Sequence, residues 1–133
     1  MYCFDTDVLV TLLRNPPLRL IRRLAEVPPE EQCTTAITLA EIAYGAAKHG
    51  GDDYAEQASA LVEYAQSVLP FDERAAEVYG PLRARLEREG KRLDEPDLRI
   101  ASIALARDIT LVTGNVRHFS RVPDLRVESW LAA

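Results

Sequence analysis

The stretch MYCFDTDVLV, residues 1–10, decides the fold class of this chain. Its first four residues form a short apolar run that predicts a buried strand, and the spacing of apolar residues from Thr6 to Arg14 predicts a helix. A strand followed at once by a helix opens an α/β unit, in which right-handed crossovers connect parallel strands. Asp5 lies at the junction of the two elements, where the strand ends.

The same alternation of short apolar runs and helical stripes continues along the chain. Further strands are predicted at 32–34, 67–71, 109–113 and 126–128. Further helices are predicted from the Pro16-Pro17 pair to about residue 25, through the alanine-rich region to about Lys48, over 54–66, over 72–88 and from about Asp97. The alanine-rich helix is apolar on nearly every side, so we expect it to be largely buried. Together these elements predict a single domain over residues 1–133, with helices around a central parallel sheet.

The charge of the chain restricts how it could bind nucleic acid. A net charge of -5 and a pI of about 5.1 argue against binding through bulk positive charge. A nucleic-acid enzyme is still compatible with these values, because the basic residues are grouped into local clusters. One cluster contains Arg14, Arg19, Arg22 and Arg23, and the other spans residues 83–92. Each cluster taken alone is typical of a solvated helix face.

Apolar segment length and cysteine content indicate the compartment. No apolar segment approaches the ~20 residues that cross a bilayer, and the N-terminus lacks the pattern of a secretory signal, so we expect a cytoplasmic protein without a membrane partner. Cys3 and Cys33 are the only cysteines, and both lie in apolar or β-prone sequence. We expect them to be buried, reduced thiols rather than a disulfide or metal ligands.

Three acidic residues interrupt apolar stretches where a core would exclude charge: Asp5, Glu41 and Asp97. Carboxylates that are brought together raise each other's pKa, so an ionised cluster requires a compensating cation. Asp5 follows the first predicted strand and Asn115 follows the strand that ends at Thr113, so both are expected at the carboxyl edge of the sheet. Carboxylate and amide oxygens are ligands for hard cations, which makes Mg2+ or Mn2+ the leading candidate.

Each of these residues also has a purely structural interpretation. Asp5 is suited to cap the helix that begins at Thr6. Thr38 and Glu41 have the spacing of a capping box, in which the glutamate only reaches back to a backbone amide. Asp97 is an ordinary residue for the first turn of a helix, and Asp94 is close enough to share the site or to cap that helix. The metal site is favoured because one shared pocket explains all three acidic positions together.

The motifs that contain these residues resemble those of PIN-domain ribonucleases, specifically the VapC toxins of toxin-antitoxin pairs. The resemblance spans nearly the whole chain and rests on FDTDVL (4–9), TAITLAEI (35–42), DLRIASIALA (97–106), LVTGNVRHF (111–119) and VPDLRVESW (122–130). It implies a three-layer α/β/α fold and identifies Asp5, Glu41 and Asp97 as metal-binding residues. The family often carries a fourth acidic residue where this chain has Asn115, which would position water or phosphate here.

The resemblance also implies a function. VapC-like proteins are Mg2+- or Mn2+-dependent endoribonucleases that cut structured RNA, pair as homodimers, and are silenced by a cognate antitoxin in a type II toxin-antitoxin complex. If water attacks the phosphate, the products carry 5′-phosphate and 3′-hydroxyl ends, since no cyclic phosphate forms. Arg99, Arg117 and His118 lie near the expected site in sequence and are candidates for contacts with RNA phosphates.

Two other interpretations of the acidic residues remain open. In a haloacid-dehalogenase-like phosphatase, Asp5 would be the nucleophile and Asp7 the acid/base partner, but Glu41 would then have no role. Alternatively, the chain is a catalytically inactive interaction module whose acidic crevice binds a basic partner peptide or a structural ion. Asp7 is a weaker metal candidate than Asp5, because a negative charge in the first turn of a helix is favoured without any chemistry.

Overall fold

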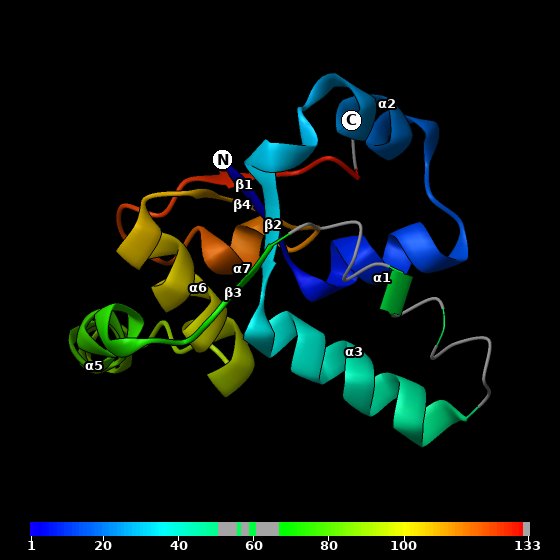
Figure 1. Cartoon of the computed structure of the whole chain (residues 1–133). Helices are drawn as coiled ribbons and strands as arrows, with labels where there is room; N and C mark the ends of the chain where they lie inside the picture. Colours follow the sequence, from blue (N-terminus) through cyan, green and yellow to red (C-terminus); the bar gives the residue numbers. More distant parts are fainter. Residues whose placement is uncertain (51–55, 57–58, 61–66, 132–133) are drawn as a thin grey trace.

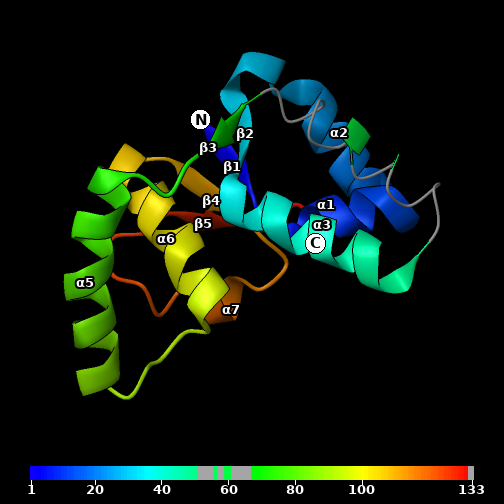
Figure 2. The same ribbon diagram turned by 60° about the horizontal axis from the view of Figure 1, so that its bottom comes forward.

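Five parallel strands form the central sheet of the protein, in the order β3-β2-β1-β4-β5. The computed structural model describes residues 1–50, 56, 59–60 and 67–131. The strands are β1 (Tyr2–Phe4), β2 (Gln32–Thr35), β3 (Val68–Leu69), β4 (Thr110–Val112) and β5 (Val127–Glu128). Helices cover both faces of this sheet, so the predicted three-layer α/β/α fold is confirmed (Figures 1 and 2).

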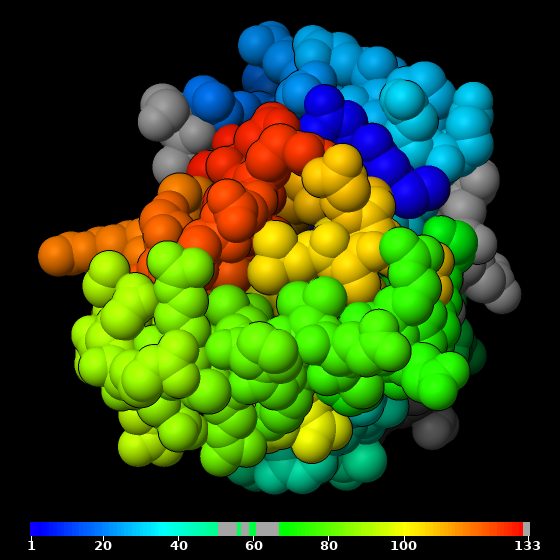
Figure 3. Space-filling view, turned by 90° about the vertical axis from the view of Figure 1, so that its left-hand side faces the viewer, coloured from blue at the N-terminus to red at the C-terminus, as the bar shows by residue number. Residues whose placement is uncertain are grey.

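The helices divide between the two faces of the sheet. Their bounds are α1 (Thr6–Arg14), α2 (Leu18–Glu26), α3 (Ala36–His49), α5 (Glu73–Arg88), α6 (Glu95–Arg107) and α7 (Val116–Phe119), with a short 3-10 turn, η1, at Pro29–Glu31. Helices α1 and α2 pack on one face, and α6 packs on the other with α5 outside it. Figure 3 shows α5 as the outer surface on that side. None of the helices that the structure describes is long and apolar enough to span a bilayer.

Alternation along the strands separates two hydrophobic cores. Successive side chains of a strand point to opposite faces of the sheet. Accordingly, Cys3 and Leu111 lie in the core beneath α5 and α6, whereas their neighbours Phe4 and Val112 lie in the core beneath α1 and α2. Trp130 is 2% exposed and packs edge-on against Phe4, with the ring centroids 5.3 Å apart.

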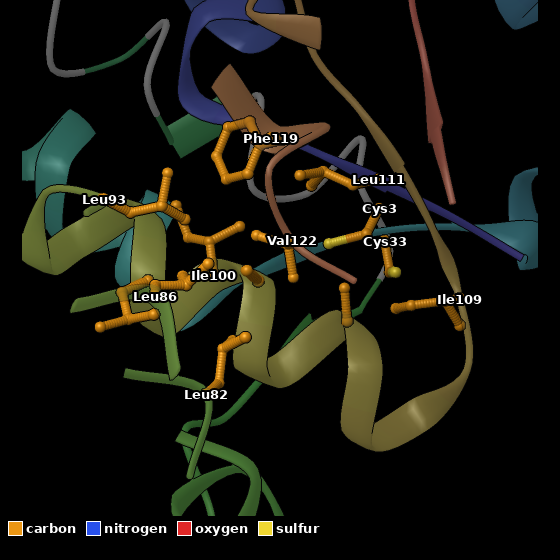
Figure 4. Packing of buried hydrophobic residues seen from close by; sticks show 13 residues of the cluster. Cys3, Cys33, Leu82, Leu86, Leu93, Ile100, Ile109, Leu111, Phe119 and Val122 are labelled. Atoms are coloured by element: carbon orange, nitrogen blue, oxygen red, sulfur yellow. The ribbon is translucent and has the colours of Figure 1, made fainter. Parts of the chain in front are cut away.

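The two cysteines occupy facing positions of neighbouring strands. Cys3 of β1 is in register with Cys33 of β2, and Figure 4 shows the two side chains next to each other. Both are free and buried, as predicted. The hydrogen bond with Cys33, followed by burial, raises the pKa of the Cys3 thiol well above its ordinary value, which makes this thiol unreactive.

Most predicted element boundaries agree with the structure, with a few differences. Helix α6 begins at Glu95, two residues before Asp97, because Pro96 is suited to the first turn of a helix. Strand β3 ends at Leu69, before Pro70, which has no N–H to donate to a neighbouring strand. The turn η1 and helix α7 were not predicted, since both are too short to show a helical period. Most of the helix predicted over 54–66 lies outside the described residues.

The expectation that the alanine-rich helix is largely buried is wrong. Only Thr38 and Ile42 of α3 are buried, and the side chain of Tyr44 is 65% exposed. The first half of α3 packs against α1 and α6, whereas its second half extends past the sheet (Figure 1). This small sheet cannot cover the full length of a 14-residue helix. The apolar second half of α3 therefore remains available for contacts with another chain.

Candidate active site

The order of the strands predicts a ligand-binding crevice at the carboxyl ends of β1 and β4. From β1 the chain builds outward through β2 to β3, and it then returns to place β4 on the other side of β1. In open parallel sheets, ligands bind at the carboxyl ends of the strands where the order reverses in this way. The two ends are joined by a hydrogen bond of 2.9 Å from the backbone N–H of Asp5 to the carbonyl oxygen of Val112. Asp5 and Thr113 are therefore neighbours, as expected from the sequence.

Asp5 is both the N-cap of α1 and the most buried acidic residue of the crevice. Its Oδ1 accepts a hydrogen bond of 2.8 Å from the N–H of Thr6, and its Oδ2 accepts one of 2.8 Å from the hydroxyl of Thr113. The residue is 5% exposed. Burial, followed by the charges of Asp7 and Asp97, raises its pKa from 3.8 to about 7, although both hydrogen bonds act in the opposite direction. Asp5 therefore caps α1 as the sequence suggested, but only its Oδ1 is used for this. Its Oδ2 instead contacts Thr113, at the end of the neighbouring strand β4.

Asp7 also belongs to this group of carboxylates. Its Oδ2 accepts a hydrogen bond of 2.9 Å from the N–H of Gly114, and its Oδ1 lies 3.5 Å from the Thr113 hydroxyl. Burial raises the pKa of Asp7. A Cβ atom on Gly114 would lie 2.7 Å from Oδ2 of Asp7 and 2.8 Å from Cδ1 of Leu131, so a larger residue here would displace these side chains. The first-turn position of Asp7 gave no indication of this contact, which forms across 107 residues of sequence.

Glu41 is oriented by the first helix of the chain. Its Oε1 accepts a hydrogen bond of 2.7 Å from the hydroxyl of Thr6. The capping box that the sequence allowed for Thr38 and Glu41 is wrong, because α3 begins earlier, at Ala36, with Thr35 as its N-cap. The Thr35 hydroxyl accepts a hydrogen bond of 3.0 Å from the N–H of Thr38. The carboxylate of Glu41 is consequently not used for capping.

Asp97 lies in the first turn of α6 and contacts His118 of α7. The Oδ2 of Asp97 lies 3.2 Å from Nε2 of His118, and both side chains are largely buried. Burial raises the pKa of Asp97, the charge of His118 lowers it, and the charges of Glu41 and Asp94 raise it. Asp94 occupies the N-cap position of α6 without a side-chain hydrogen bond to the helix. The sequence singled out His118 only as an RNA contact, and its position beside a carboxylate depends on the packing of α7.

Asn115 and the two arginines differ in how they relate to the crevice. Asn115 is exposed at the start of α7, and its N–H donates a hydrogen bond of 3.0 Å to the Thr113 hydroxyl. Arg99 pairs with Glu95 at 2.7 Å and stacks 5.5 Å from the centre of the Phe71 ring, and it lines a pocket together with Glu41. Arg117 is exposed on α7.

The carboxylates interact electrostatically but do not form a closed cage. Asp7 and Asp97 raise the pKa of Asp5, and Glu41 raises the pKa of Asp97, so each of the four interacts with at least one of the others. Within the described part of the chain, no three acidic, histidine or cysteine side chains are grouped closely enough to hold a metal ion as they stand. Asp5, Asp7 and Glu41 each accept a hydrogen bond from a nearby donor, and Asp97 contacts His118. The chemistry of these oxygen atoms suits a hard cation.

Comparison with known proteins finds relatives of one family, and they match nearly the whole chain. A model of the PIN domain family matches residues 2–125. The protein named Ribonuclease VapC2 from Haemophilus influenzae is 32% identical over 133 residues, which cover 98% of both chains. The tRNA(fMet)-specific endonuclease VapC of Salmonella typhimurium is 35% identical over 132 residues, or 97% of both chains.

Solved structures agree with these sequence relatives. One is the structure of VapBC2 from Rickettsia felis bound to a DNA fragment from its promoter. A chain of that structure superposes on this protein with a TM-score of 0.84 at 30% sequence identity, covering 97% of this chain and 98% of that chain. FitAcB from Neisseria gonorrhoeae gives a TM-score of 0.86 at 27% identity and covers all of both chains.

Proposed function

Because the chain belongs to the PIN domain family, we propose that it is an endoribonuclease whose active site contains Asp5, Glu41 and Asp97. The observation that carries this proposal is the group of mutually repelling carboxylates at the switch point of the sheet, with the pKa of Asp5 raised to about 7. Such a group is costly for the fold unless positive charge enters it, so a purely structural role for it is disfavoured.

The site is proposed to hold Mg2+ or Mn2+ through Asp5, Glu41 and Asp97. When bound, a divalent cation supplies charge that stabilises the phosphate in the transition state and lowers the pKa of a water molecule. The Thr113 hydroxyl holds Asp5, the Thr6 hydroxyl holds Glu41, and His118 holds Asp97. These donors restrict the rotation of each carboxylate before substrate arrives. The exposed amide of Asn115 at the edge of the crevice is placed to orient water or a phosphate oxygen.

The proposed products carry a 5′-phosphate and a 3′-hydroxyl. Attack by water leaves the ribose 2′-hydroxyl unreacted, so no cyclic phosphate is formed. This separates the proposed reaction from that of ribonucleases that use the 2′-hydroxyl as the nucleophile. The phosphatase alternative would leave Glu41 without a role, and family membership favours the nuclease over it.

The protein is further proposed to be the toxin of a type II toxin-antitoxin pair in the cytoplasm. Several of its structural relatives were solved as VapBC complexes. We expect this chain to form a homodimer and to bind a cognate antitoxin as a single domain over residues 1–133. Exposed apolar side chains on α2 and α3, namely Leu18, Ile21 and Tyr44, provide surface for such contacts.

A digestion of total RNA tests the proposed activity. The wild type is expected to cleave RNA with Mg2+ or Mn2+ and to stop when EDTA is added, and its products should be ligatable through their 5′-phosphates. Asp5→Asn and Glu41→Gln should abolish cleavage, whereas Glu30→Gln, at an exposed residue of η1, should retain it. Cleavage that persists in the Asp5→Asn protein would refute the assigned site. A wild type that binds RNA and cuts none of it under any metal would favour the inactive interaction module.

A further inference from the structure

A basic groove lies on α2 beside the C-terminal segment of the chain. It has a volume of about 610 Å3. Its lining consists of Arg19, Arg22, Arg23 and Glu26 from α2, together with Glu128, Ser129, Trp130 and Leu131. In Figure 1, the segment after β5 runs toward α2, which brings these two parts of the chain together.

Arg23 lies in the groove and forms ion pairs with both acidic residues of the groove lining. Its guanidinium stacks 5.0 Å from the centre of the Trp130 ring and 5.5 Å from that of Tyr2. It also pairs with Glu26 at 3.5 Å and with Glu128 at 3.7 Å. The negative charges of the groove are therefore directed to this one cation.

Arg19 and Arg22 are left with their charges uncompensated. Both are exposed, and neither forms an ion pair or side-chain hydrogen bond with any residue that the structure describes. Exposed guanidinium groups of this kind are suited to phosphate oxygens, because their N–H groups match the geometry of two phosphate oxygens. The groove thus presents two cations without a charged partner among the described residues, in a protein whose net charge is -5.

Leu131 connects the groove to the carboxylate crevice, because it lies next to both. This side chain lines the groove, and its Cδ1 also approaches Gly114, whose N–H holds Asp7. An RNA strand that enters the crevice meets several carboxylates that repel its phosphates, so it needs positive charge close by. Cations next to Leu131 are in a position to supply that charge.

We propose that Arg19 and Arg22 form a binding site for the phosphate backbone of the RNA substrate, on the Leu131 side of the scissile bond. This inference rests on the proposed ribonuclease function and adds to it a site for the substrate outside the carboxylate group. The interactions are with phosphates alone, so they contribute affinity without selecting a base sequence. Each such contact releases counterions from the RNA, which makes its contribution dependent on salt.

Equilibrium binding by the non-cleaving Asp5→Asn protein tests this proposal. The probe is fluorescein-labelled total transfer RNA, and the anisotropy is measured from ~50 to ~300 mM KCl. The test variant adds Arg19→Gln and Arg22→Gln. The matched control adds Arg88→Gln and Lys91→Gln, which remove the same charge from exposed residues at and just beyond the C-terminal end of α5. Two lost phosphate contacts should weaken binding about 25- to 60-fold near 0.1 M salt and reduce the salt slope by about 1.4 to 1.8.

The outcomes separate this site from the general charge of the protein. The proposal is supported if the α2 double variant loses affinity and salt slope while the α5 double variant matches its parent. Equal losses in both double variants would overturn it, since only net charge would then matter. It is also overturned if RNA affinity is unchanged and the groove instead binds an acidic segment of the antitoxin. An Asp5→Asn parent that binds no transfer RNA overturns it as well, and wild-type cleavage assays report separately on the ribonuclease itself.

Discussion

Replacing Asp5 with asparagine is expected to change the dependence of stability on pH as well as activity. In the folded protein, the pKa of Asp5 is raised from 3.8 to about 7, so the folded state binds this proton more tightly than the unfolded chain. The stability contributed by the protonated form is therefore lost as the pH rises from about 4 to about 7. For the metal-free protein, this one group lowers the free energy of unfolding by about 2.5 kcal/mol between pH 5 and pH 8.

The asparagine variant should keep the fold and lose this pH dependence. The amide oxygen still accepts from the N–H of Thr6, and the Thr113 hydroxyl can rotate to accept from the new amide and donate toward Asp7. Urea unfolding in EDTA at pH 5 and pH 8 measures the effect, as the difference between the wild type and the variant. Adding Mg2+ at pH 8 should then stabilise the wild type by about 2.7 kcal/mol at a concentration of 100 Kd, and the variant by much less.

Two results would refute this reasoning about Asp5. Equal pH dependence in the wild type and the variant would mean that Asp5 has an ordinary pKa in the folded protein. Equal stabilisation of both proteins by Mg2+ would mean that Asp5 is not part of the cation site.

Two further substitutions test the hydrogen bonds that hold the site. Gly114→Ala places a methyl group 2.7 Å from the carboxylate of Asp7, so it should lower the free energy of unfolding by about 1–3 kcal/mol and reduce cleavage. The control is Gly80→Ala in α5, where a Cβ meets no atom within 4 Å. This variant should be neutral or more stable by about 0.5–1 kcal/mol. A Gly114→Ala protein as stable as wild type in urea unfolding would contradict the tight packing there. Thr113→Val removes the hydroxyl that lowers the pKa of Asp5, so the acidic limb of the cleavage rate should move to higher pH. An unshifted or downward-shifted pH-rate profile would show that this hydrogen bond does not control the ionisation of Asp5.

The placement of Asp5 could be predicted from sequence because short-range rules fix it. An apolar run followed by a helical stripe defines the end of β1, and parallel strands bring their carboxyl ends to one edge. The same rules placed Asn115 after β4. Approximate bounds of the longer helices followed for the same reason, as with α5, which begins where Asp72 caps it.

The remaining contacts of the site depend on packing between distant segments. The hydrogen bond from Thr6 to Glu41 and the contact of His118 with Asp97 require particular positions of α3 and α7 against α1 and α6. No periodicity in the sequence encodes these distances. The exposure of Tyr44 could not be predicted either, because an apolar helix appears the same in sequence whether its own domain or another chain covers it.

The hydrogen bond between Thr113 and Asp5 joins residues that are 108 positions apart, near opposite ends of the chain. A ribosome that is making this protein releases Asp5 early, but the crevice cannot assemble until β4 has emerged and inserted beside β1. Incomplete chains therefore lack the site, so truncated or prematurely terminated products would be inert toward the RNA of the cell that makes them. The site is therefore complete only after the chain has been synthesised through Thr113.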